Sequence, residues 1–111
     1  MKHTNHNMTV KQPYFEYLRS GYKTIELRLY DEKRRKIQPG DTITFTNGDL
    51  SFQVEVKGLF ICENFERLFE FVNPKDTGLE TTENAIHVME QFYDKEAQEK
   101  FGVVGIVVET I

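Results

Sequence analysis

The most informative segment of this chain is Gly21-Tyr-Lys-Thr-Ile-Glu-Leu-Arg28. Apolar and polar residues alternate along its second half, which is the period-two pattern of a half-buried strand. We therefore predict a strand over residues 23–29, with Ile25 and Leu27 directed towards a core. The residues on the opposite face are Thr24, Glu26 and Arg28.

Lys23 raises a question of geometry within this segment. It lies three residues before Glu26, so a regular strand would send the two side chains to opposite faces. Both side chains reach one pocket only if Lys23 lies in the loop before the strand, or if the strand is bulged at its start. The position of Lys23 relative to the strand therefore decides whether the segment forms one site.

The polar residues of this segment have several possible roles. A desolvated lysine is a usable base or nucleophile, and a guanidinium such as that of Arg28 suits phosphate, carboxylate or a base edge. Glu26 suits a general base or a hydrogen-bond acceptor, and Thr24 supplies a hydroxyl. Spacing alone favours a plainer interpretation, in which Glu26 and Arg28 form a surface ion pair worth little.

Length and composition indicate one globular domain. The chain has 111 residues, of which 39% are hydrophobic, and no apolar run approaches the ~20 residues that span a bilayer. Residues 1–7 lack the apolar region of a secretory signal, so we expect a flexible leader there and a single domain over residues 8–111. The single cysteine fits a reducing compartment, which predicts a cytoplasmic location without a membrane partner.

Charge is distributed unevenly along the chain. The net charge is −4, yet residues 1–41 contain nine Lys and Arg against five Asp and Glu, whereas residues 42–111 contain five against thirteen. The turn Lys33-Arg34-Arg35-Lys36 concentrates positive charge close to the strand segment. Such a field attracts phosphate, although a solvated charged turn explains it equally well. His3 and His6 have no further ligand at metal-binding spacing, so we expect neither a metal nor a cofactor.

The rest of the sequence predicts short strands and short helices. Gly58 interrupts an alternating strand and indicates a bulge there. Asn73-Pro74 ends one amphipathic helix, and Thr82 caps another whose apolar face includes Met89 and Phe92. The expected strands cover residues 8–11, 23–29, 42–46, 51–61 and 103–109, and the expected helices cover residues 13–20, 65–72, 82–93 and 94–100. This order predicts an α+β fold, a small mixed β-barrel of five or six strands with flanking short helices.

The motif Gly-x-Lys-Thr-x-Glu-x-Arg, followed by Gly40-Asp41, resembles the ASCH domain of the PUA-like superfamily. The segments 12–15 and 101–106 resemble that domain as well, so the likeness extends from Met8 onwards. The resemblance implies a small PUA-like barrel, and it implies that Lys23, Glu26 and Arg28 line a ligand cleft.

Some members of the superfamily resemble amide hydrolases that act on N4-acetylcytidine through a lysine, a threonine and a glutamate. The lysine corresponds to Lys23, but the position of the threonine is occupied here by Glu26. The glutamate is not assigned; the candidates are Glu80, Glu83, Glu90, Glu96 and Glu99.

These observations predict a module that binds RNA or a nucleotide-like ligand in a cleft centred on the motif. We expect Tyr14 to stack on a base, with Tyr22 and Tyr30 as further candidates. The expected ligand-binding residues are Tyr14, Thr24, Arg28, Lys33, Arg34 and Arg35, of which the last three would contact phosphate.

Two alternatives remain open. The first is an amidohydrolase that acts on a modified nucleoside, with Lys23 and Glu26 as its catalytic residues. An enzyme of this kind requires a closed pocket with Lys23 partly buried, whereas a module that binds a nucleic-acid strand requires an open groove beside the basic turn. The second is a protein-interaction domain that uses the acidic helices of the C-terminal half. The sequence does not predict an oligomeric state.

Overall fold

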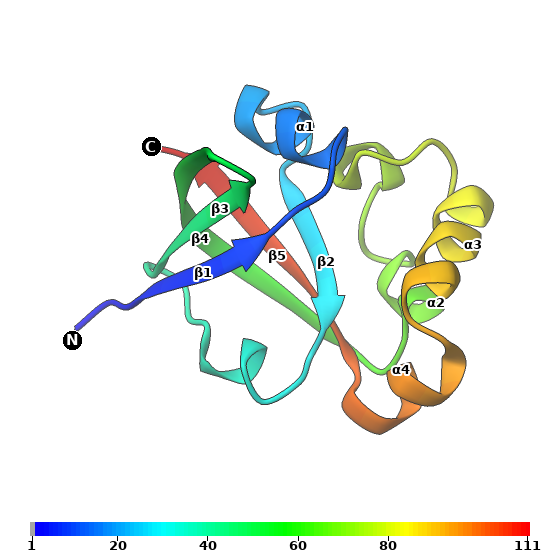
Figure 1. Cartoon of the computed structure of the whole chain (residues 1–111). Helices are drawn as coiled ribbons and strands as arrows, with labels where there is room; N and C mark the ends of the chain where they lie inside the picture. The colour runs from blue at the N-terminus through cyan, green and yellow to red at the C-terminus, as the bar shows by residue number, and fades with distance from the viewer. Residues whose placement is uncertain (1) are drawn as a thin grey trace.

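A curled five-stranded sheet forms the centre of the architecture (Figure 1). The computed structural model describes residues 2–111. The fold is α+β, as predicted, with five strands and four α-helices. The elements are β1 (Asn5–Thr9), α1 (Tyr14–Ser20), β2 (Ile25–Leu29), η1 (Arg34–Lys36), β3 (Thr42–Asn47), β4 (Leu50–Cys62), α2 (Phe65–Leu68), η2 (Pro74–Thr77), α3 (Thr82–Phe92), α4 (Lys95–Phe101) and β5 (Val103–Thr110). The helices α2, α3 and α4 lie together on one side of the sheet, and α1 lies apart from them (Figure 1).

The strand order is β1-β3-β4-β5-β2, so the first two strands in sequence are the two edges of the sheet. β1 pairs with β3 in parallel, and the other three pairs are antiparallel. The sheet curls until these edges approach each other, and Arg28 on β2 donates from Nη2 to the carbonyl of Thr9 at 2.8 Å. The result is a half-barrel whose open seam lies between β1 and β2.

Two hydrophobic clusters occupy the two faces of the sheet. One lies inside the curl and includes Phe15 and Leu18 of α1, while the other lies between the sheet and the helices α2 and α3. Ile25 and Leu27 belong to the second cluster, so the predicted core face of β2 packs against the helices. Glu26 is opposite Ile106 in the β5 register and therefore faces the inner cluster.

Turn and bulge positions follow the sequence signals closely. α1 ends at Gly21, which adopts a left-handed conformation with φ of 83°. The β4–β5 register shifts between Val56 and Gly58, which confirms the bulge predicted there. The hairpin between β3 and β4 turns at Gly48, whose φ is 59°. The bulge bends β4 and increases the local twist of the sheet.

The first strand begins earlier than the sequence predicts. β1 covers Asn5–Thr9 rather than residues 8–11, so the expectation of a flexible leader over residues 1–7 is wrong from Asn5 onwards. The strand is polar because it lies at a sheet edge, and only Met8 among its residues is buried. It is fixed instead by Asp41, which accepts from Thr4 N at 3.0 Å and lies 2.8 Å from His6 Nε2.

Two helix boundaries also differ from the prediction. The amphipathic helix predicted over residues 65–72 is regular only over Phe65–Leu68, although Phe69 and Val72 are buried as the pattern indicates. The next helix is capped by Thr81, whose hydroxyl accepts from Asn84 N, rather than by Thr82. Neither difference alters which residues form the core.

Candidate functional site

Lys23 lies in the loop that joins α1 to β2, so it escapes the alternation of the strand. Its backbone N–H donates to the carbonyl of Tyr17 at 2.9 Å, and that of Thr24 donates to the carbonyl of Asp76 at 2.8 Å. The carbonyl of Thr24 in turn accepts from Val108 N at 2.9 Å. These bonds to α1, η2 and β5 hold the loop on three sides and direct the lysine towards Glu26.

A buried ion triad forms the centre of the site. Lys23 Nζ lies 2.8 Å from Glu26 Oε1, and Arg28 Nη2 lies 2.7 Å from Glu26 Oε2. Arg28 Nε also donates to Oε2 at 2.9 Å. Lys23 is 6% exposed and Glu26 is 4% exposed. One carboxylate therefore holds two cations, and the triad carries a net positive charge beside the inner core.

Glu26 is held in its ionised form by these neighbours. Burial on its own raises the pKa of Glu26, but Lys23 and Arg28 attract and hydrogen-bond the carboxylate, and the pKa falls below its ordinary value. A carboxylate with a lowered pKa is a weak proton acceptor. Glu26 is therefore better suited to positioning the two cations than to activating water.

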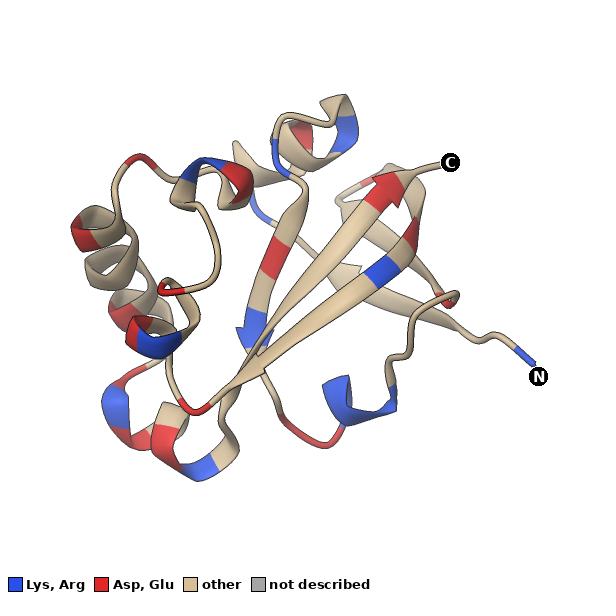
Figure 2. Ribbon diagram, turned by 180° about the vertical axis from the view of Figure 1, so that it is seen from behind, with Lys and Arg blue, Asp and Glu red and all other residues tan. Residues whose placement is uncertain are grey.

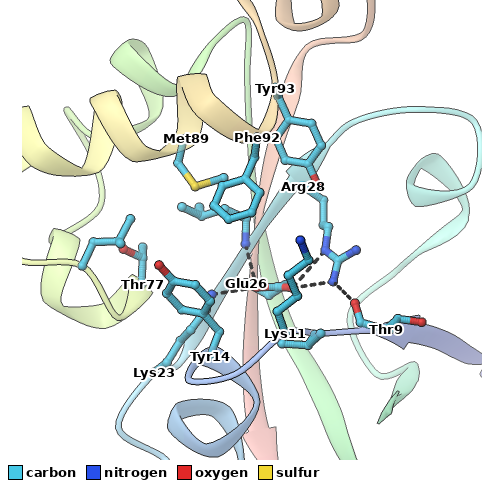
Figure 3. A pocket seen from close by; sticks show the side chains of 13 residues that line it. Thr9, Lys11, Tyr14, Lys23, Glu26, Arg28, Thr77, Met89, Phe92 and Tyr93 are labelled. Carbon is cyan, nitrogen blue, oxygen red and sulfur yellow. Dashed lines mark hydrogen bonds and ion pairs between the residues drawn. The ribbon is translucent and has the colours of Figure 1, made fainter. Parts of the chain in front are cut away.

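A pocket of about 200 Å³ opens above the triad (Figure 3). Lys23 and Glu26 lie at its buried end, whereas Phe92, which is 50% exposed, and the exposed Lys11 lie at its mouth. The lining residues come from β1 and its continuation, α1, the motif, η2 and α3: Thr9, Val10, Lys11, Tyr14, Lys23, Glu26, Leu27, Arg28, Thr77, Leu79, Met89, Phe92 and Tyr93.

Lys23 contacts two other residues of the pocket lining, Tyr14 and Glu26. Its Nζ lies 4.9 Å from the centre of the Tyr14 ring, in addition to its contact with Glu26. An ammonium group has three N–H donors, and Glu26 is the one hydrogen-bonding acceptor that residues 2–111 provide. Lys23 therefore keeps donor capacity for a ligand in the pocket.

The structure brings four of the predicted site residues together and places four elsewhere. Lys23, Glu26, Arg28 and Tyr14 all line the pocket. Thr24 does not, because its backbone holds the start of β2. The residues of the basic turn, Lys33, Arg34 and Arg35, also lie outside the pocket lining.

The basic turn has its own contacts around η1, which is basic along its whole length (Figure 2). Lys33 Nζ donates to the carbonyl of Asn7 at 2.9 Å, and Arg34 Nη1 pairs with Asp31 at 3.0 Å. Arg35 lies over the Tyr30 ring at 4.4 Å and donates to the carbonyl of Phe101. These three residues therefore lie outside the pocket that Lys23 lines, and their contact with phosphate stays a prediction.

Sequence reasoning missed the helical side of the pocket. Met89, Phe92 and Tyr93 lie at helical spacing and read as an ordinary core face, yet all three line the pocket. A core residue would be buried, but the Phe92 side chain is 50% exposed. The one signal available in the sequence was the pair of consecutive aromatic residues Phe92 and Tyr93 at the end of α3. One face of a helix cannot bury two consecutive side chains, so one of the two rings had to lie outside the core.

Neither a metal cluster nor a membrane helix is present in the part of the chain that the structure describes. Within residues 2–111, no three His, Cys, Asp or Glu side chains are grouped to hold a metal ion. No helix among these residues is both long enough and apolar enough to cross a membrane.

The curled five-stranded sheet with flanking short helices is consistent with a PUA-like fold. The family model of the ASCH domain matches residues 8–111, and the chain therefore belongs to the ASCH domain family.

Two solved structures share the fold. The crystal structure of the hypothetical protein PH0355 is 39% identical, with a TM-score of 0.87 over 96% of this chain and 99% of that chain. The solution structure of protein PF0455 from Pyrococcus furiosus is 36% identical, with a TM-score of 0.77 over 96% and 97%. A comparison with curated proteins found no significant match.

Proposed function

We propose that this ASCH domain binds a nucleotide-like ligand, free or within RNA, and that the base enters the pocket above Glu26. The observation that carries the proposal is a small pocket bordered by aromatic rings, with two cations fixed at its inner end by one buried carboxylate. Such a combination supplies stacking surfaces and directed hydrogen-bond donors to one ligand.

The size of the pocket favours one ring system. A cavity of about 150 Å³ accommodates benzene, so about 200 Å³ is enough for a single heterocycle. A whole nucleotide exceeds this space. The sugar and phosphate of a ligand would therefore remain at the mouth, near Lys11 and Phe92.

The charges of the pocket favour a ligand with hydrogen-bond acceptors. Lys11, Lys23 and Arg28 oppose the single carboxylate of Glu26 in the lining. Carbonyl and ring-nitrogen acceptors of a base satisfy the spare donors of Lys23 without adding buried charge. A cationic ligand would be repelled by the same groups.

Paired tyrosine variants test the stacking contact. Tyr14→Leu removes an aromatic ring from the pocket lining, whereas Tyr22→Leu removes one that is 61% exposed and lies outside it. We expect Tyr14→Leu to weaken nucleoside binding by about 1–3 kcal/mol, as base stacking predicts, and Tyr22→Leu to leave it unchanged. Isothermal titration with a panel of nucleosides measures both, and equal affinities for the two variants would contradict the proposal.

Lys23→Met tests the donor at the inner end. A hydrogen bond from a charged donor contributes about 1.5–3 kcal/mol, so we expect at least a tenfold loss of nucleoside affinity. Lys57→Met is the matched control, because Lys57 pairs with Glu55 on β4 and lies outside the pocket. The proposal is wrong if wild-type protein binds no nucleoside, or if both variants bind equally well.

The burial of Lys23 also favours the hydrolytic alternative, in which Lys23 and Glu26 cleave an acylated nucleoside such as N4-acetylcytidine. The lowered pKa of Glu26 opposes this reaction, because the carboxylate would have to accept a proton from water. We therefore expect acylated nucleosides to bind without turnover. Chromatography of a reaction at high protein concentration is the check, and deacylation that Lys23→Met abolishes would establish the hydrolase instead.

A further inference from the structure

Three cationic side chains are associated with alternate residues of the first strand. On its free edge, Lys33 donates to the carbonyl of Asn7, and Arg28 donates to the carbonyl of Thr9. The next residue in this alternation is Lys11, just beyond the end of β1. Alternate residues of an extended strand are about 6.6 Å apart, so the carbonyls of Asn7 and Thr9 hold the first two cations in a row along the seam, and Lys11 follows at its end.

Each cation in this row retains free donors. Lys11 is exposed, and its ammonium contacts no acceptor within residues 2–111. Arg28 uses Nε and Nη2 for its contacts, which leaves Nη1 available. Lys33 is exposed and makes one hydrogen bond to a neutral carbonyl. The row therefore holds three positive charges, of which only Arg28 is paired with a carboxylate.

The surroundings of the row do not cancel its charge. Residues 5–11 contain no acidic side chain, and Glu26 is already shared between Lys23 and Arg28. Arg34, by contrast, is neutralised by Asp31, and Arg35 lies over Tyr30. Within residues 2–111, Lys11 and Lys33 thus keep their charge without a carboxylate partner beside β1.

We infer that Lys11, Arg28 and Lys33 form a phosphate-binding track for single-stranded RNA whose base occupies the pocket. The inference rests on the proposed function, because Lys11 and Arg28 also line the pocket and so join the track to it. The spacing of the anchoring positions is comparable to that of successive phosphates in an extended strand. A groove of cations beside aromatic rings is how single-stranded nucleic acid is held without reading its sequence.

The test compares ligands that share a base but differ in phosphates: a nucleoside, its 5′-monophosphate and a short homopolymeric oligoribonucleotide. Fluorescence anisotropy measures oligonucleotide affinity as salt rises, and isothermal titration measures the two small ligands. The variants are Lys11→Met and Lys33→Met, with Lys57→Met as the charge-matched control on β4. Thermal melting verifies that each variant is folded.

We expect the oligonucleotide to bind more tightly than the nucleoside and to show a salt dependence that the nucleoside lacks. Losing one phosphate contact reduces the slope of log affinity against log salt by about 0.7. Lys11→Met and Lys33→Met should each show this reduction, and Lys57→Met should match the wild type. Lys33→Met should bind the nucleoside normally, because Lys33 lies outside the pocket lining.

The outcomes separate the two proposals. If the nucleoside binds but phosphates add no affinity, or if all three variants share one salt slope, the track is refuted while the base pocket stands. If the oligonucleotide binds and the nucleoside does not, the base pocket is refuted, and with it the track that leads from it. If neither ligand binds, both proposals fail.

Discussion

Glu26 is the side chain on which the site depends. It is buried beside the inner core, and its two oxygens each contact a different cation. Burial of a lone carboxylate would be strongly unfavourable, and so would burial of either cation alone. The triad is therefore a unit, and each member fixes the position of the others.

Glu26→Gln should destabilise the fold by about 3 kcal/mol, because it leaves two cations close together without a balancing charge. The comparison variant is Glu55→Gln, which breaks an exposed pair with Lys57 and should cost less than about 1 kcal/mol. Urea unfolding at neutral pH measures both free energies. Equal losses in the two variants would show that the triad contributes no more than a surface pair.

The same carboxylate predicts a pH dependence. The pKa of Glu26 is lowered in the folded state, so the unfolded chain binds more protons in acid. Its contribution to stability is complete above the ordinary value of 4.5 and is lost as pH falls through the lowered folded value. The stability difference between wild type and Glu26→Gln should therefore shrink as pH falls below 4.5. A difference that stays constant into acid would show that Glu26 is not held ionised by Lys23 and Arg28.

The sequence identified the members of the triad but not their burial. Alternation placed Glu26 and Arg28 on one face, and the resemblance added Lys23. A surface ion pair was the favoured interpretation from spacing alone, because nothing local shows that the Glu26 face of this strand lies against the inner cluster. Thr24 was assigned to the ligand from its hydroxyl, whereas the fold uses its backbone.

The 3₁₀ helix η2 positions Lys23 from the side. Gly78 follows η2 with φ of 82°, and a Cβ added there would lie 3.2 Å from Tyr17 Cδ2 and 3.3 Å from Lys23 Cδ. Gly21 has a similar φ of 83°, but a Cβ there would meet nothing within 4 Å. Both glycines thus adopt the left-handed backbone conformation, but only at Gly78 would an added side chain meet Lys23.

This difference gives a matched pair of variants. Gly78→Ala and Gly21→Ala should each lose about 1 kcal/mol of stability from the left-handed conformation. Only Gly78→Ala should also weaken nucleoside binding, because its methyl group displaces the Lys23 side chain. Chemical denaturation and isothermal titration measure the two effects, and unchanged affinity in Gly78→Ala would mean that η2 does not position the lysine.

Elements were predictable where their pattern was local. The predicted end of the first helix at residue 20 and the predicted bulge at Gly58 each depend on a single glycine, and both are confirmed. The strand Asn5–Thr9 was missed over its first three residues, because its pairing with β3 and the contact of His6 with Asp41 join residues far apart in sequence. The pocket wall from α3 was missed for the same reason.

The molecule as a whole depends on an edge strand that forms one rim of the pocket. β1 is held to the rest of the sheet by β3 and by buried Asp41, which accepts from Thr4 N and Gln38 N as well as contacting His6. Burial raises the pKa of Asp41, but these hydrogen bonds outweigh it and the pKa is lowered. The carboxylate therefore fastens the N-terminal strand to the turn before β3.

Asp41→Ala should loosen this strand and cost about 2 kcal/mol, because two backbone donors in partly buried hydrogen bonds lose their acceptor. Asp49→Ala, in the exposed hairpin turn, is the control and should be nearly neutral. Hydrogen exchange should show faster exchange in residues 5–9 of Asp41→Ala than in the control. Unchanged protection there would mean that β3 alone holds the strand.

We propose that a base occupies the pocket above the Lys23–Glu26–Arg28 triad. The decisive measurement is a crystal structure of the protein soaked with a nucleoside. We expect the base beside Tyr14 and Phe92, with one of its acceptors within hydrogen-bonding distance of Lys23 Nζ. A nucleoside bound on another surface, with the pocket unoccupied at saturating concentration, would contradict the claim.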